Sequence, residues 1–105
     1  MRTLEFNVTS QRLRKDPRCS FSHIIMGSEN FLKARFNFKT SEWNNAIKVA
    51  VFYTDTTNEY IPLIKNECMV PNSITKSKIF KIQVIGVGGG QKIPTNELTV
   101  RQEEP

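Results

Sequence analysis

Residues 31–53 read FLKARFNFKTSEWNNAIKVAVFY, and this stretch decides the fold class. Its first part, residues 31–39, alternates apolar and polar side chains, which is the period-two pattern of a strand with one apolar face. The apolar positions are Leu32, Ala34, Phe36 and Phe38, and the polar positions are Lys33, Arg35, Asn37 and Lys39. Residues 40–45 are rich in turn formers. Residues 46–54 are therefore predicted to form a second strand, with Trp43 at the corner and inside the core.

This second strand is apolar on both faces, because Ala50 and Phe52 alternate with Ile47, Val49 and Val51. Such a strand is either central in a sandwich or half of an interface. We expect Ala50 and Phe52 to point inward, which leaves the three β-branched residues on the opposite face. An exposed apolar patch of this kind often marks a protein contact. The sequence thus predicts an interface at these three residues with another copy or another protein. The alternative is that a neighbouring strand or the segment 10–18 covers them within the monomer.

The rest of the chain divides into short β segments separated by turn clusters. Strands are predicted at residues 3–8, 19–26, 59–64, 68–71, 78–87 and 96–102. Pro62 cannot donate a ladder hydrogen bond, so its strand is placed at an edge. Gly88, Gly89 and Gly90 are interpreted as a hairpin loop, since no helix follows them. No segment keeps a helical period, and the pattern predicts an all-β, antiparallel β-sandwich of about seven or eight strands.

Length and composition predict a single domain over residues 1–105, with a core over 3–101 and a polar tail at 102–105. No run approaches the roughly 18 apolar residues of a membrane span, so no membrane partner is expected. The N-terminus lacks the apolar core of a secretion signal, which predicts synthesis in a reducing cytoplasm. Cys19 and Cys68 are accordingly expected to be free thiols.

The formal net charge is +5, and the most basic segment is residues 10–18. Its cations are Arg12, Arg14, Lys15 and Arg18. This segment is either a solvated loop or short ribbon, or an anchor for an acidic partner. The other cations are spread along the chain, and no nucleic-acid-binding motif accompanies them. The sequence therefore disfavours nucleic acid as the partner.

No catalytic constellation is present in the sequence. The single histidine, His23, together with two cysteines gives too few ligands for a closed zinc site. Cys19 and His23 would be about 13 Å apart on a regular strand, beyond hydrogen-bond reach. We therefore predict no catalytic residue, no bound metal and no cofactor, and a protein that is not an enzyme.

One ordered set of residues goes further than strand patterning. It runs from FLKARFNF at 31–38 through Glu42-Trp43, Lys48-x-Ala50-x-Phe52, Tyr60-x-x-x-Ile64, Cys68-x-Val70-Pro71, Phe80-Lys-Ile-x-Val-x-Gly86 and Ile93-x-Thr95-Asn96-x-x-x-Val100. In order and spacing it resembles small immunoglobulin-like modules in virion proteins of phages of Gram-positive bacteria, including baseplate and receptor-binding apparatus proteins. The resemblance covers about residues 4–101.

The resemblance implies an immunoglobulin-like β-sandwich made in the bacterial host cytoplasm and assembled into a virion, where it contacts other virion proteins or itself. It brings no catalytic motif with it. Two other functions stay open at this stage. A module that binds cell-surface glycans would need exposed aromatic rings, for which Trp43, Tyr53 and Tyr60 are the candidates. A small basic regulator would bind nucleic acid or a host protein through the segment 10–18.

Overall fold

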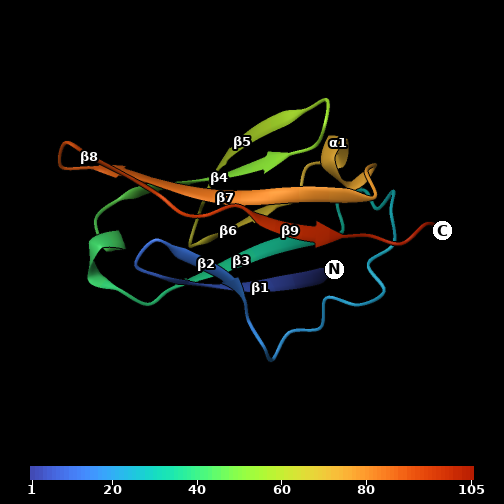
Figure 1. Cartoon of the computed structure of the whole chain (residues 1–105), viewed down its shortest axis with the longest axis horizontal. Coiled ribbons are helices and arrows are strands. Elements are labelled where there is room, and N and C mark those ends of the chain that lie inside the picture. The colour runs from blue at the N-terminus through green and yellow to red at the C-terminus, as the bar shows by residue number, and fades with distance from the viewer.

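Two β-sheets pack face to face in the computed structural model, which describes residues 1–105 (Figure 1). The four-stranded sheet contains β1 (Arg2–Thr9), β2 (Arg12–Lys15), β3 (Leu32–Phe38) and β6 (Glu67–Met69), in the order β2-β1-β3-β6. The five-stranded sheet contains β4 (Ile47–Tyr53), β5 (Asn58–Pro62), β7 (Ile79–Gly88), β8 (Gln91–Pro94) and β9 (Leu98–Arg101). Its order is β5-β4-β7, and both β8 and β9 pair with β7. The predicted all-β sandwich is confirmed.

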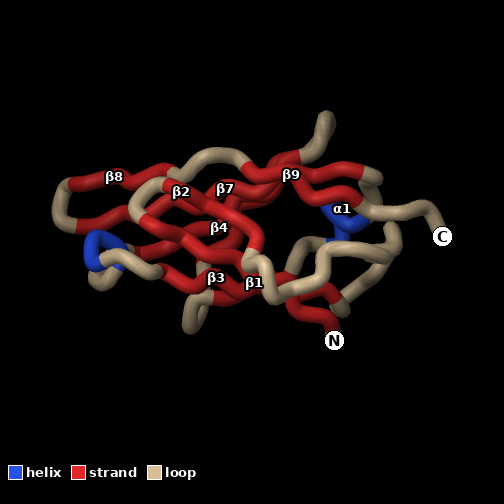
Figure 2. The backbone as a smooth tube through the Cα atoms, turned by 60° about the horizontal axis from the view of Figure 1, so that its bottom comes forward, coloured by secondary structure: helices blue, strands red, loops and turns tan.

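Two short helices close the ends of the sandwich. The 3-10 helix η1 (Ser41–Trp43) and the α-helix α1 (Asn72–Thr75) lie at opposite ends of the long axis (Figure 2). The hairpin of β7 and β8 extends at the η1 end, whereas both chain termini lie at the α1 end (Figure 1). None of the helices is long and apolar enough to span a membrane.

The core lies between the sheets and is built from alternate residues of both. Phe6 of β1 stacks on Phe36 of β3 with ring centroids 5.2 Å apart, and Phe52 of β4 contacts Phe80 of β7 at 6.3 Å. All four rings are buried, as the period-two pattern predicts. Trp43 is also fully buried, so its predicted place in the core is confirmed.

One strand pair departs from the antiparallel prediction. β1 and β3 run parallel, with Arg2 opposite Leu32 and Val8 opposite Phe38. The chain turns back after β1 to form β2 on one edge, and then returns through a long connection before β3 starts beside β1. Alternation of apolar residues is the same in parallel and antiparallel strands, so the sequence pattern carries no information on direction.

The predicted strand at 19–26 is wrong. These residues form a loop with a single β-bridge, between Ile25 and Glu103. The guanidinium of Arg2 donates hydrogen bonds to the carbonyl oxygens of Ser20, Ser22 and His23, at 3.1, 2.7 and 2.9 Å. Because one side chain satisfies these backbone acceptors, the loop needs no ladder partner.

The segment after β9 is also more ordered than the predicted polar tail. Gln102 is buried, and its amide nitrogen donates to the carbonyl oxygens of Thr75 and Ser77, at 3.1 and 2.7 Å. The backbone N–H of Glu103 donates to Ile24, and its carbonyl accepts from Met26. The bonds of Gln102 tie the end of the chain to α1 and the residues after it, and those of Glu103 tie it to the loop that precedes β3.

Candidate functional site

The outer face of the five-stranded sheet carries a continuous apolar surface, which we call the apolar face. Its members are Ile47, Val49 and Val51 of β4, Tyr60 and Pro62 of β5, and Ile85 and Val87 of β7. Ile47 is paired with Val87, Val49 with Ile85 and Pro62, and Val51 with Tyr60. Directly paired residues project from the same side of a sheet, so these side chains are neighbours across three strands.

The three predicted interface residues differ in exposure. Ile47 is 71% exposed, Val49 is half-buried and Val51 is fully buried. All three lie on the strand face opposite Ala50 and Phe52, which point inward as predicted, and the monomer covers them to different extents. The monomer itself covers Val51, which is the alternative that the sequence left open, whereas Ile47 stays available.

Val51 is buried, unlike Ile47, because of its strand partners. It is flanked by Tyr60 on β5 and Gln83 on β7. The Gln83 side chain is fixed on the sheet surface, because its oxygen accepts from the Tyr53 hydroxyl at 2.6 Å and its nitrogen donates to the Thr95 carbonyl at 2.8 Å. Ile47 sits at the start of β4, where its partner on β7 is Val87 and not a hydrogen-bonded side chain such as Gln83.

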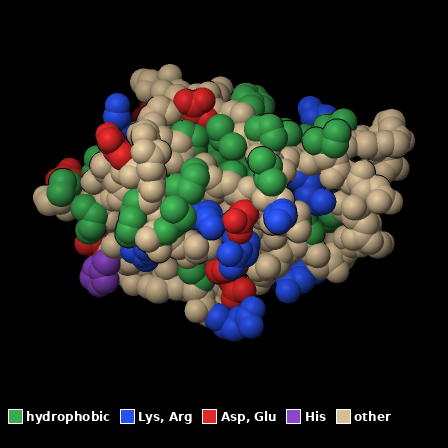
Figure 3. Space-filling view, turned by 180° about the vertical axis from the view of Figure 1, so that it is seen from behind, with side chains coloured by type: hydrophobic (Ala, Val, Ile, Leu, Met, Phe, Trp, Pro, Cys, Tyr) green, Lys and Arg blue, Asp and Glu red, His purple; other side chains and the backbone are tan.

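Four members of the apolar face are exposed: Ile47, Tyr60 at 62%, Val87 at 48%, and Pro62. Seen from behind, hydrophobic side chains gather in the upper half of the molecule, which is the half that the five-stranded sheet occupies in Figure 1 (Figure 3). Below them lies a group of alternating basic and acidic side chains (Figure 3). The two outer faces of the sandwich thus differ in chemical character.

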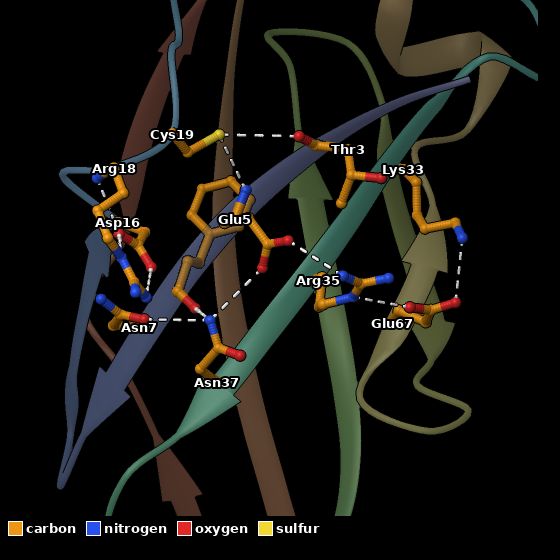
Figure 4. A network of polar contacts seen from close by, with 11 residues as sticks. Thr3, Glu5, Asn7, Asp16, Arg18, Cys19, Lys33, Arg35, Asn37 and Glu67 are labelled. Carbon is orange, nitrogen blue, oxygen red and sulfur yellow. Dashed lines mark hydrogen bonds and ion pairs between the residues drawn. The ribbon is translucent and has the colours of Figure 1, made fainter.

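The outer face of the four-stranded sheet carries a polar network (Figure 4). The Arg35 guanidinium lies between two carboxylates, 3.1 Å from Glu5 and 3.0 Å from Glu67. Lys33 adds a second ion pair to Glu67 at 3.1 Å. Hydrogen bonds from Arg35 and then Lys33 lower the pKa of Glu67. These four side chains neutralise one another in the centre of the sheet.

Arg18 is neutralised by Asp16 in a separate ion pair. The carboxylate of Asp16, which is buried, accepts from the backbone N–H of Arg18 at 2.9 Å and from its guanidinium at 3.1 Å. The hydrogen bond from the Arg18 side chain, followed by that from its backbone, lowers the pKa of Asp16. Of the predicted basic segment, Arg18 is therefore a structural ion-pair partner and contributes no free charge.

The remaining three cations of that segment form no ion pair, and they gather around one depression that we call the basic hollow. It has a volume of about 500 Å³ and is lined by Asn7, Thr9, Arg12, Arg14, Lys15 and Pro17. Arg14 is paired with Asn7 and Arg12 with Thr9, so both arginines project from the outer face of the sheet. The Lys15 ammonium lies 5.1 Å from the centre of the Phe21 ring.

Asn96 fixes the strand that carries these cations. Its side-chain oxygen accepts from the backbone N–H of Leu13 at 2.6 Å, and its amide nitrogen donates to the Leu13 carbonyl at 3.1 Å. The Gln11 amide also donates to the carbonyl of Pro94. The side chain of Asn96 thus takes the place of a further strand on the free edge of β2. Sequence reasoning missed this role, because 83 residues separate the two partners.

The residues considered for catalysis or metal binding do not converge. The ring nitrogen Nδ1 of His23 lies 3.2 Å from the Glu103 carboxylate at the surface. Cys19 and Cys68 are free, and burial, followed by the charge of Glu67, raises the pKa of the Cys68 thiol to about 12. Nowhere do three or more His, Cys, Asp or Glu side chains form a group that could hold a metal ion.

The three aromatic residues considered for glycan binding also lie apart. Trp43 is in the core, and Tyr60 belongs to the apolar face. Tyr53 lines a depression of about 660 Å³ together with Lys81 and Glu97, whose charged groups are 4.0 Å apart. Only Tyr53 is therefore placed beside polar groups suited to a sugar.

Compared with known proteins, the sequence matches no protein-family model and no curated protein.

Proposed function

We propose that the chain is a non-enzymatic structural module of a phage virion, in the tail, the baseplate or a related part, and that it acts by protein–protein assembly through the apolar face. The observation that carries the proposal is the exposure of Ile47, Tyr60 and Val87 on one face of one sheet. Burial of apolar area is favourable by roughly 25 cal/mol per Å², so an apolar surface of this kind gains stability by packing against a protein. The virion setting rests on the resemblance of residues 4–101 described above.

The partner that we assign to the apolar face is a second copy of the chain. The face lies on adjacent strands, and two sheets pack well face to face with side chains interdigitating across about 10 Å. A two-fold contact needs only one self-complementary patch on each copy. The apolar face offers one continuous patch for such a contact, because half-buried Val49 and Ile85 join Ile47 and Val87 at one end to Tyr60 at the other.

The test compares Ile47→Lys with Ile64→Lys. Both isoleucines are highly exposed, at 71% and 75%, but Ile64 lies after β5 and outside the apolar face. We expect Ile47→Lys to stay folded by circular dichroism and to lose self-association in sedimentation velocity and incorporation into particles. Ile64→Lys, which adds the same charge, should assemble as the wild type does.

Three outcomes would contradict parts of this proposal. Normal association and incorporation of Ile47→Lys would remove the apolar face from assembly. A wild-type chain that is monomeric at all concentrations, but whose incorporation still depends on Ile47, would replace the second copy by another virion protein. A chain that never co-purifies with particles would remove the virion setting.

A second candidate function, glycan binding, is favoured by the depression beside Tyr53. Its ring is held by the hydrogen bond to Gln83, and Lys81 and Glu97 offer a donor and an acceptor to sugar hydroxyls. Binding of the wild-type chain, but not of Tyr53→Ala, to an array of bacterial surface glycans would support this function. Absence of binding across the array would leave assembly as the function of the chain.

A further inference from the structure

We propose that the basic hollow is a docking site for an extended, carboxylate-bearing segment of a second, acidic protein. The hollow lies on the outer face of the four-stranded sheet, so it is separate from the apolar face and does not depend on it. The first argument is charge. Lys33, Arg35 and Arg18 are each within 3.1 Å of a carboxylate, whereas Arg12, Arg14 and Lys15 have none within 4 Å.

Two carboxylates of the same sheet region, Glu5 on β1 and Asp16 just after β2, cannot neutralise these cations. Glu5 is already bound by Arg35, and Asp16 by Arg18. The hollow therefore presents guanidinium and ammonium donors, with the hydroxyl of Thr9 beside them, and no free carboxylate lines it. A site made of unpaired cationic donors is complementary to an anion with several acceptor oxygens.

The spacing of the two arginines indicates the shape of that anion. Arg12 and Arg14 are two residues apart on a strand, so their positions are about 6.6 Å apart and share one face. Carboxylates at alternate positions of an extended peptide repeat at the same distance. Each guanidinium presents a planar fork that binds a carboxylate through two parallel hydrogen bonds.

The strand holding the arginines is fixed before any partner arrives. The side chain of Asn96 bonds both backbone groups of Leu13, the residue between the two arginines, and the backbone N–H of Asp16 donates to the backbone carbonyl of Glu5 at 3.0 Å. Ordering a flexible segment on binding is costly, and a site that is already ordered avoids this loss.

The rest of the sheet favours a protein segment over nucleic acid. Beyond the hollow, Lys33 and Arg35 on the same face are already paired with Glu5 and Glu67, so a phosphate backbone that continued across the sheet would meet no unpaired cation there. A second copy fits this site poorly, because the chain has no two acidic residues at alternate positions of its sequence. A short acidic segment of a different protein would occupy only the hollow, and it would supply the carboxylates that a second copy does not.

The test uses a fluorescein-labelled peptide of four Thr-Glu repeats, with four Thr-Gln repeats and an eight-nucleotide oligothymidylate as competing probes. Fluorescence anisotropy at about 0.1 M salt compares the wild type with Arg12→Gln/Arg14→Gln. The matched control is Lys76→Gln/Lys92→Gln, which removes the same charge from exposed lysines outside the hollow. We expect binding of the glutamate peptide to weaken at least about tenfold in the arginine double variant and to stay within about twofold in the lysine control.

Equal weakening in both double variants would reduce the effect to net charge and overturn the proposal. Tighter binding of the oligonucleotide than of the glutamate peptide would overturn it in favour of nucleic acid, and no binding by the wild type would remove the site. Should the arginine double variant unfold, Arg12→Lys/Arg14→Lys keeps the charge and removes the forked donors. The proposal then requires weaker peptide binding by that variant, and wild-type affinity would overturn it.

Discussion

Gly86 lies against the indole of Trp43 so closely that a methyl group at position 86 would be 2.7 Å from the ring carbon Cζ3. The ring cannot retreat easily, because its N–H donates to the carbonyl of Ser10 at 2.8 Å and the ring also packs against Phe38, with centroids 5.0 Å apart. We expect Gly86→Ala to lower the free energy of unfolding by about 1–3 kcal/mol through overpacking, measured by urea denaturation.

A double-mutant cycle with Trp43→Phe isolates this contact. The smaller ring of phenylalanine leaves room for the methyl group, so Gly86→Ala should cost clearly less in the Trp43→Phe background. Strictly additive losses in the free energy of unfolding would show that the two residues do not restrain each other.

Phe36 tests the assignment of the core. It is 1% exposed and stacks on Phe6, so Phe36→Ala should lower the free energy of unfolding by about 3–5 kcal/mol. Phe31→Ala is the matched control. Phe31 is 45% exposed just before β3, so its truncation should change the free energy of unfolding little. A melting temperature of Phe36→Ala equal to that of the wild type would contradict the buried position.

Glu67 gives a pH dependence with a definite sign. Arg35 and Lys33 hold its pKa below the ordinary value of 4.5, so the folded state favours the ionised carboxylate. Its contribution to stability is complete above about pH 4.5 and is lost as the pH falls through the lowered pKa of the folded state. We expect Glu67→Gln to lose less stability than the wild type between pH 5 and pH 3 in thermal melts. Parallel curves for the two proteins would rule out this contribution.

The thiols are expected to react mainly after unfolding. Since burial raises the pKa of Cys68 to about 12, its reactive thiolate is scarce in the folded protein at pH 8. Iodoacetamide should therefore modify Cys68 slowly in the native state and rapidly in denaturant without any reductant, as followed by peptide mass spectrometry. A native mass two hydrogens lighter than the reduced chain would contradict the free thiols.

The sequence predicted well what side-chain alternation determines. Phe36, Phe52 and Phe80 are buried because a period of two places them on one face of their strands. It predicted less well what long-range partners determine. The side chain of Arg2 hydrogen-bonds the backbone of residues 19–26 in place of a neighbouring strand, and the side chain of Gln102 anchors the end of the chain. Neither set of hydrogen bonds leaves a periodic signal in the sequence.

The same distinction applies to the candidate surfaces. Alternation placed Ile47 and Val51 correctly on the face opposite the core, but the side chains of neighbouring strands decide that only Ile47 is exposed. Composition located the basic segment, but the buried carboxylate of Asp16 decides that Arg18 is neutralised while Arg12 and Arg14 are not. Exposure and charge pairing depend on tertiary contacts, which a single sequence does not encode locally.

The parallel pairing of β1 with β3 constrains how the chain can reach its native state. Every partner of a β1 residue on β3 lies thirty positions later, as with Arg2 and Leu32, so no tight turn can bring the two strands together. On the ribosome, β1 can form only its hairpin with β2 until β3 has emerged. Closing this long loop is entropically costly and precedes any gain from the central strand contacts. Refolding is therefore expected to be on the order of milliseconds to seconds, as in other β-sandwiches dominated by non-local pairings.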